Sequence, residues 1–248
     1  MTSNSHSQNN EQSPIADDTY VIYIREESGT LTIVPEECSD NQTKLSDHVR
    51  RDERLAQTIK SAARQSRARL RNHAVSRSLG VCMTLTYRDV TDDPIGDVTA
   101  FIENIRGFYP PPLHWIIVTE GVEEGSDHRP HHHVLLPFTS DLHKVASQWP
   151  HGDIHVGINP NDESIRRVAN YVSKEFERPT GNQPRFRASR GGRPKKKVIH
   201  ASSLEEAINI ANSQLPEGID AYTSNYPGIN GRITYYWERT PQEDMWES

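Results

Sequence analysis

The sequence predicts an α+β fold in which helices pack on a central antiparallel sheet. Between residues 81 and 176, short apolar runs of strand length alternate with segments whose apolar residues recur at helical spacing. Two of the apolar runs, 113–120 and 131–138, are joined by a turn-rich connection that is typical of a hairpin. The resulting order of strands and helices favours an antiparallel sheet with helices packed on it.

Composition limits what this fold can be. The 248 residues are enough for one compact domain with extensions, or at most two small domains. No apolar run approaches the ~18 residues of a membrane helix, and the polar N-terminus shows no apolar signal region. The chain has only 2 cysteines, for which a reducing compartment is the simplest interpretation. We therefore expect a cytoplasmic protein without a membrane partner.

The N-terminal part is expected to lie outside the central sheet. Residues 1–18 are polar and predict a disordered tail. The segments TYVIYI and TLTIV are rich in β-branched and aromatic residues and flank REESG, which predicts a small hairpin. Residues 44–79 lack proline and glycine and predict one long helix or two, ending before Gly80. Residues 19–79 are thus expected to form a hairpin and a basic helical extension.

Residues 80–180 are expected to form the core. VCMTLTY predicts a short buried strand, and DVTAFIENIRGF predicts a helix that three prolines bring to an end. DLHKVASQW and DIHVGI follow the hairpin and predict a short helix and a strand. DESIRRVANYVSKEFE, residues 162–177, predicts the last helix of the core, with Asp162 or Ser164 as its N-cap.

Residues 181–248 are expected to form a C-terminal extension. RPTGNQPRFRASRGGRPKKK is basic and interrupted by glycine and proline, which predicts a loop. SLEEAINIANSQL then predicts a helix, and GRITYYWER predicts a late strand.

Basic residues gather in two runs, although the net charge of the chain is −6. Residues 50–77 hold nine basic residues against two acidic ones, and residues 185–197 hold seven against none. A single run of this kind is ordinarily a solvated helix face or loop, but two runs flanking the apolar segments favour a phosphate-binding surface. The candidate DNA contacts are Arg64, Arg67, Arg71, Arg185, Arg187, Arg190, Arg193, Lys195, Lys196 and Lys197.

Three consecutive histidines open the strand predicted at 131–138. Alternate side chains of a strand share a face, so His131 and His133 point to one side and His132 to the other. Glu120 ends the preceding strand and can lie beside the first pair across the hairpin. Two imidazoles and one carboxylate leave coordination positions of a metal ion open, as in a catalytic site.

Two alternatives remain open for this cluster. Glu123 and Glu124, in the turn itself, compete with Glu120 for the role of third ligand. The cluster can also be a histidine-rich turn without a metal. The segment HGDIH at 151–155 shows how easily such spacing arises.

Tyr171 stands apart from the apolar stripe of the helix predicted at 162–177. At about 100° per residue, the apolar residues of this helix share one face, and Tyr171 lies about a third of a turn from its centre. Lys174 is three residues further on and neighbours Tyr171 on the helix surface. The tyrosine hydroxyl could therefore enter a cleft, and the alternative is a half-buried tyrosine beside a snorkelling lysine.

The segments MTLTY, PHHHVLL and YVSK, in this order, resemble the three motifs of the HUH endonucleases. That superfamily includes the rolling-circle replication initiators of plasmids, filamentous phages and small single-stranded DNA viruses. The resemblance covers about residues 60–195 and implies a ferredoxin-like or RRM-like HUH fold for the core. It implies that His131 and His133 bind a divalent metal ion, Mg²⁺ or Mn²⁺, with Glu120 as the acidic ligand.

The same resemblance implies a reaction. Tyr171 matches the nucleophile and Lys174 the lysine that follows it, and no second tyrosine stands one helical turn away. Such an enzyme nicks single-stranded or hairpin origin DNA, forms a 5′-phosphotyrosine and leaves a 3′-hydroxyl that primes rolling-circle replication. Since the chain has no G-x-x-x-x-G-K-[ST] motif, we expect a separate host or replicon helicase.

Two other functions fit the same sequence features. A transposase or conjugative relaxase would use the same chemistry for another task. A non-catalytic DNA-binding regulator would use the basic runs alone. A covalent protein–DNA adduct that depends on a divalent ion separates either enzyme from the regulator.

Overall fold

The structure is a computed structural model. It describes residues 19–36, 49–121, 129–177, 184–191, 195–217, 222–225 and 233–237. Within this part of the chain, no helix combines the length and the apolarity needed to cross a membrane.

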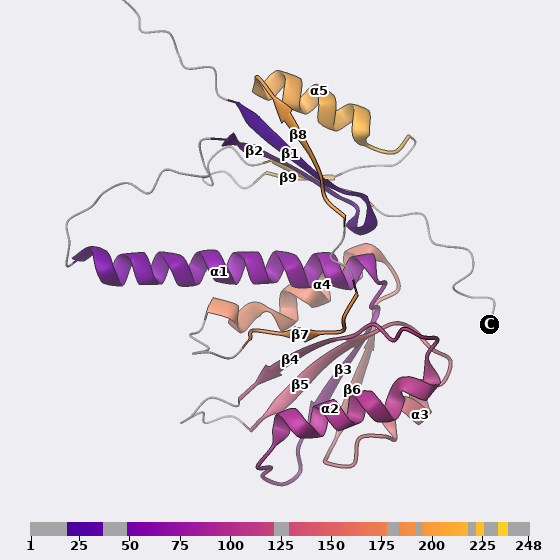
Figure 1. The fold of residues 1–248 in the computed structure, drawn as a ribbon. Helices are drawn as coiled ribbons and strands as arrows, with labels where there is room; N and C mark the ends of the chain where they lie inside the picture. The colour runs from indigo at the N-terminus through magenta and orange to yellow at the C-terminus, as the bar shows by residue number, and fades with distance from the viewer. Residues whose placement is uncertain are drawn as a thin grey trace, which may run out of the picture.

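Five antiparallel strands form the central sheet (Figure 1). In the order of the sheet they are β6 (Ile154–Ile158), β3 (Val81–Thr86), β5 (His131–Leu136), β4 (Ile116–Glu120) and β7 (Arg187–Ala188). The register pairs Glu120 with His131 and Thr84 with His133. The polar ends of three neighbouring strands therefore meet at one end of the sheet.

Helix α2 (Pro94–Ile105) covers one face of the central sheet. It begins after Asp93, whose carboxylate accepts a hydrogen bond from the backbone N–H of Gly96 at 2.8 Å, as an N-cap residue does. Its apolar side packs on the β-strand residues Met83 and Val134. The short helix α3 (Leu142–Ala146) lies in the same layer.

Helices α1 (Val49–Ser76) and α4 (Asp162–Val172) cover the opposite face. A capping box starts α4. The Asn161 side chain accepts from the N–H of Ser164, and the Ser164 hydroxyl accepts from the N–H of Asn161. Buried residues such as Val172 pack on Leu135 of the sheet, and a 3-10 turn, η4 (Lys174–Glu177), follows α4.

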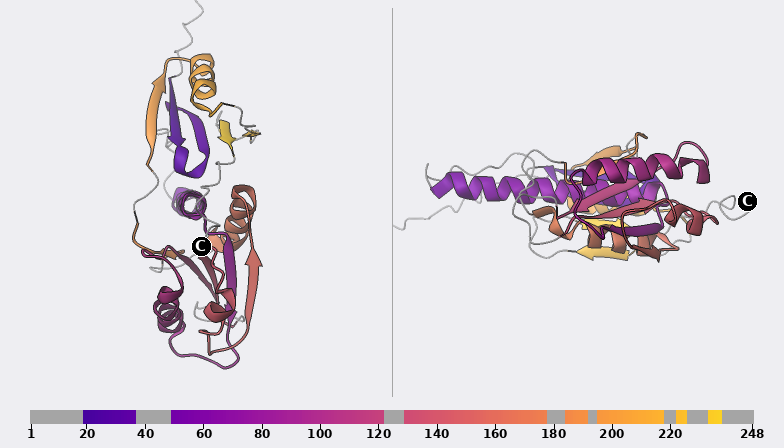
Figure 2. Two further views of the ribbon diagram at one scale, coloured as in Figure 1. Left: turned by 90° about the vertical axis from the view of Figure 1, so that its right-hand side faces the viewer. Right: turned by 90° about the horizontal axis from the view of Figure 1, so that it is seen from below.

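A second antiparallel sheet lies on the other side of α1 (Figure 2). Its strands are, in order, β8 (Lys197–Ala201), β1 (Tyr20–Arg25), β2 (Thr30–Pro35), β10 (Ile233–Tyr236) and β9 (Tyr222–Asn225). Helix α5 (Leu204–Gln214) packs on the face that is turned away from α1. In the left view of Figure 2, α1 is seen end-on between the two sheets.

The turn between β1 and β2 is a short 3-10 segment, η1 (Glu26–Ser28), that ends at Gly29. Gly29 has a φ of +54°, and a Cβ atom there would lie within contact of the Trp237 carbonyl oxygen. Glycine suits this position because it carries no side chain and tolerates a left-handed backbone. The turn can thus lie directly against the residue that follows β10.

The α+β class and the antiparallel pairing predicted from the sequence are confirmed. The N-terminal hairpin is also confirmed, but it is not isolated, since β8, β10 and β9 extend it into a sheet. The segment 44–79 gives one helix, α1, and the expected tail at 1–18 lies outside the described residues.

Two local predictions were wrong. The N-cap of α4 is Asn161, and Asp162 and Ser164 are its first and third helical residues. The segment expected to be a basic loop contributes two strands, because Arg187–Ala188 pairs with β4 and Lys197 begins β8. Neither strand has the alternation of apolar and polar residues that makes a strand visible in a sequence.

Candidate metal and tyrosine site

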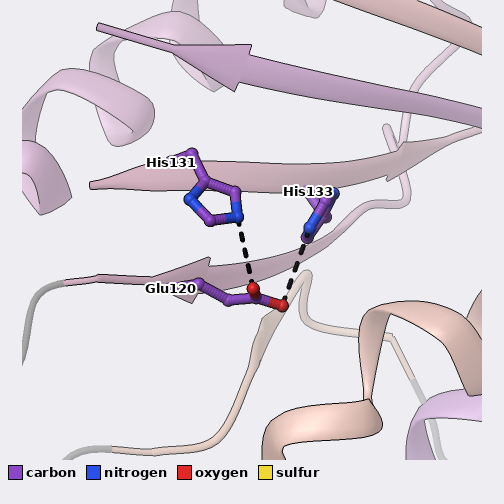
Figure 3. Close-up of side chains that lie close together, drawn as sticks. All are labelled: Glu120, His131 and His133. Atoms are coloured by element: carbon purple, nitrogen blue, oxygen red, sulfur yellow. Dashed lines mark ion pairs between the residues drawn. The ribbon is translucent and has the colours of Figure 1, made fainter. Parts of the chain in front are cut away.

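Three potential metal ligands meet at the end of the central sheet (Figure 3). Glu120 ends β4, and His131 and His133 lie on the same face of β5. The Nε2 atom of His131 lies 3.2 Å from Oε2 of Glu120, and Nε2 of His133 lies 3.6 Å from Oε1. One ligand atom from each residue lies within 4.8 Å of the other two. The group can therefore converge on a single ion.

The two imidazoles are held so that their Nε2 atoms face the carboxylate. Nδ1 of His133 lies 3.1 Å from the hydroxyl of Thr84, which belongs to the neighbouring strand β3. Nδ1 of His131 donates to the backbone carbonyl of Arg129 at 3.3 Å. Metal-binding histidines commonly use one ring nitrogen in this way, because the bond fixes the ring and leaves the other nitrogen for the metal.

The carboxylate and the two imidazoles alter each other's protonation. The hydrogen bond from His131 lowers the pKa of Glu120, and the same bond raises the pKa of His131. Burial lowers the pKa of His133 and favours its neutral form. An ionised carboxylate and a neutral imidazole are the forms in which these side chains bind a metal ion.

Two buried polar atoms point to the place of an ion. Oε1 of Glu120 and Nε2 of His133 have no hydrogen-bond partner among the described residues. Their separation of 3.6 Å is too long for a hydrogen bond between them. Because buried polar atoms are rarely left unpaired, a cation between them would remove a free-energy cost that both atoms carry. The residues present therefore fit a divalent metal ion.

His132 lies on the other face of β5 and is fully buried. Its Nε2 lies 2.9 Å from the hydroxyl of Tyr87, and its Nδ1 lies 2.9 Å from that of Thr119. Burial lowers its pKa to about 4, so it is neutral at neutral pH. The alternation expected from the sequence places it as the structure does, and its surroundings make it a satisfied core histidine.

Tyr171 and Lys174 come to the same end of the sheet from α4 and η4. Tyr171 is 57% exposed, so it is not part of the buried stripe of α4. Its ring centroid lies 6.0 Å from that of His133, and the two rings meet edge to face. The Nζ atom of Lys174 lies 4.7 Å from the Tyr171 ring centroid, and the charge of Lys174 contributes to the lowered pKa of Glu120. The histidines, the acid, the tyrosine and the lysine thus form one group.

The candidate DNA contacts do not form one free surface. Arg64, Arg190, Lys195 and Lys197 are exposed, whereas Arg193, like Glu123 and Glu124, lies outside the described residues. The remaining candidates make contacts within the fold. Arg67 bonds to the end of α4, Arg71 lies over the Tyr236 ring, Arg185 donates to the Phe176 carbonyl, Arg187 donates to the Thr99 hydroxyl, and Lys196 lies over the Tyr23 ring.

The expectation that the whole run 185–197 is free to meet phosphates does not hold for Arg185 and Arg187. Both are partly buried, and each uses its guanidinium in a hydrogen bond within the fold. The part of this run that remains available among the described residues is Arg190 with the exposed lysines 195–197.

Residues 80–176 match the model of a family that is described as replication-associated proteins of the ORF2 group. This match supports a Rep-type replication initiator. The matched segment begins just before β3 and ends in η4, so it includes Glu120, the histidines, Tyr171 and Lys174. No curated protein and no solved structure gives a significant match to the chain.

Sequence reasoning missed the residues that hold the ligands in place. Thr84 orients the His133 ring, and Thr119 and Tyr87 hold His132. A signal existed for Thr84, since it interrupts the apolar run VCMTLT at a position that alternation places with the metal-site face. The backbone carbonyl of Arg129 carries no such signal, because any residue supplies one.

Proposed function

We propose that the protein initiates replication by nicking single-stranded or hairpin origin DNA through a covalent intermediate on Tyr171. The observation that carries this proposal is the position of the Tyr171 ring beside His133, at the edge of the group that can hold a metal ion. Tyr171 is exposed enough for a DNA phosphate to reach it. The family match over the same segment supports a replication role for the site.

The proposed reaction exchanges one phosphodiester for another. The phenol oxygen of Tyr171 forms a bond to phosphorus, and the bond between phosphorus and the 3′ oxygen breaks. The phenol loses its proton, and the departing 3′ oxygen takes one up. The free energy of the broken bond is kept in the phosphotyrosine, so a later 3′-hydroxyl can reverse the step. The released 3′ end can prime DNA synthesis.

Each residue of the group has a proposed role. Glu120, His131 and His133 would hold Mg²⁺ or Mn²⁺, and a bound ion would polarise a non-bridging oxygen of the scissile phosphate. Imidazole ligands favour Mn²⁺, whereas phosphate chemistry and cellular supply favour Mg²⁺. Lys174, next to the Tyr171 ring, would stabilise the phenolate or the negative charge that builds up on the phosphate.

The deciding experiment is a search for the covalent adduct. A labelled single-stranded oligonucleotide from the replicon's own origin is incubated with the protein and Mn²⁺, and the product is resolved under denaturing conditions. We expect an adduct with the parent protein, none with Tyr171→Phe, and none when a chelator is added. An adduct formed by the Phe variant would exclude Tyr171 as the nucleophile. DNA binding by the parent without any adduct would favour a regulator that only binds DNA.

A further inference from the structure

Arg67 of α1 binds the chain directly after Tyr171. Its Nε donates to the carbonyl of Ser173 at 3.1 Å, one terminal nitrogen donates to the carbonyl of Lys174 at 3.1 Å, and the other forms an ion pair with Glu177 at 2.9 Å. All three guanidinium nitrogens are therefore used within five residues of the chain. The Arg67 side chain is 27% exposed, so most of it lies within the fold.

The bound segment is the place where α4 changes to the 3-10 turn η4. The last carbonyls of a helix have no partner within the helix, and a positive charge beside them also interacts well with the helix dipole. Arg67 supplies both a charge and directed donors at this point. Its acceptors include the backbone of Lys174, whose Nζ lies over the Tyr171 ring.

The opposite end of α4 is held by a second arginine. Arg166 is buried, and one terminal nitrogen of its guanidinium donates to the carbonyls of Ser28, Gly29 and Trp237 at 3.0–3.3 Å. These acceptors belong to the second sheet and to the residue that follows it. The helix that carries Tyr171 is thus held at both ends by residues outside the segment 80–176.

We propose that Arg67 is a positioning residue, which fixes the end of α4 so that Tyr171 and Lys174 face the group of Glu120, His131 and His133. This inference rests on the proposed function, since it concerns the alignment of that nucleophile. It replaces the sequence-based expectation that Arg67 contacts DNA. A guanidinium already engaged in three bonds within the fold offers little to a phosphate.

The substitution Arg67→Lys separates the two roles. Lysine keeps the positive charge and can serve a phosphate contact, but it cannot reproduce three directed bonds from a planar fork. Arg67→Ala removes both the charge and the bonds. Arg69→Lys and Arg69→Ala are matched controls, because Arg69 is exposed on the same helix and lies two residues on, about 200° around the axis.

Two measurements are made on the full chain with Mn²⁺ and the origin oligonucleotide. The first is the single-turnover rate of adduct formation at saturating DNA, together with the DNA affinity. The second is hydrogen exchange of the backbone amides of residues 169–177. We expect Arg67→Lys and Arg67→Ala to slow the adduct step roughly ten- to hundred-fold, as small misplacements of a reacting group do. Both variants should speed exchange in this segment, and neither should change DNA affinity by more than about two-fold.

Three results would overturn the inference. The first is a rate at saturating DNA that stays at the parent level, whatever the exchange shows. The second is unchanged exchange at residues 169–177. The third is a loss of affinity in Arg67→Ala that Arg67→Lys restores, which is the behaviour of a DNA contact. Failure of the proposed function is recognised separately, by an adduct in Tyr171→Phe or by no adduct in the parent.

Discussion

The ring of Tyr171 meets the ring of His133 edge to face, with 6.0 Å between the centroids, across the boundary between α4 and β5. The tyrosine is a neighbour of the metal group without being one of its ligands. Tyr171→Phe keeps this ring contact and removes only the hydroxyl. We therefore expect the Phe variant to bind Mn²⁺ within about two-fold of the parent while it fails to form the adduct. Calorimetric titration with Mn²⁺ measures the affinity, and a large loss would make the hydroxyl a ligand.

Substitution of the three consecutive histidines should give two different outcomes. His131→Ala and His133→Ala should each abolish Mn²⁺ binding and adduct formation, because each removes a ligand. His132→Ala should retain Mn²⁺ binding but lower the free energy of unfolding by about 2–4 kcal/mol, since it leaves a cavity and two hydroxyls without their partner. Titration with Mn²⁺ and urea unfolding distinguish these effects. Equal loss of Mn²⁺ binding in all three variants would contradict the assignment of faces.

Thr84→Val should weaken the metal site without removing a ligand. Valine has nearly the shape of threonine but cannot bond to Nδ1 of His133, so the ring loses its support. We expect Mn²⁺ affinity to fall roughly ten- to hundred-fold, with little change in the fold. Thr86→Val, in the same strand, is the control, because the Thr86 hydroxyl bonds to a backbone carbonyl of another segment. Equal affinities for Thr84→Val and the parent would show that the support is unimportant.

The exposed lysines at 195–197 should bind DNA phosphates without regard to sequence. Their replacement by alanine should weaken binding similarly for several oligonucleotides and flatten the salt dependence by up to roughly one unit of slope per lost contact. Fluorescence anisotropy over a range of salt concentrations measures both quantities. Lys144→Ala, an exposed lysine paired with Asp141 on another part of the surface, is the control. An unchanged slope in the triple variant would leave the basic residues of α1 and Arg190 as the candidates.

His73 should make the fold sensitive to mild acid. Burial, and then the charges of Arg77 and His114, lower its pKa to about 4 from the ordinary histidine value of 6.5. Between these two values the unfolded chain binds more protons than the folded one, so stability should fall as the pH drops from 6.5 toward 4. His73→Gln should reduce this fall, and His143→Gln, at an exposed position, should not. Urea unfolding at several pH values gives the slopes, and parallel curves for parent and His73→Gln would refute the assignment.

The sequence predicted the metal group because the interactions that form it are local. Strand alternation placed His131 and His133 on one face, and a hairpin connection brought Glu120 beside them. Tyr171 was found for a similar reason, since helical spacing separated it from the buried stripe. These arguments use only the periodicity of one or two neighbouring elements.

The contacts missed from the sequence are long-range and involve backbone atoms. Arg67 looked like a DNA contact because it belongs to a basic run, yet its acceptors lie more than 100 residues further along the chain. The two residues of β7 are too few to show a period, and β8 begins inside a basic run. Partners of this kind are chosen by the packing of the whole fold, which no local pattern records.

The mixed origin of the second sheet has a consequence for how the protein is made. The hairpin β1–β2 is among the first segments to leave the ribosome, but its neighbours β8 and β10 are synthesised more than 160 residues later. Trp237, which accepts a hydrogen bond from Arg166, follows them. A growing chain can thus contain every ligand of the metal group while α4 still lacks one of its anchors. Translation must pass residue 237 before the tyrosine helix has all the bonds that hold it in the finished molecule.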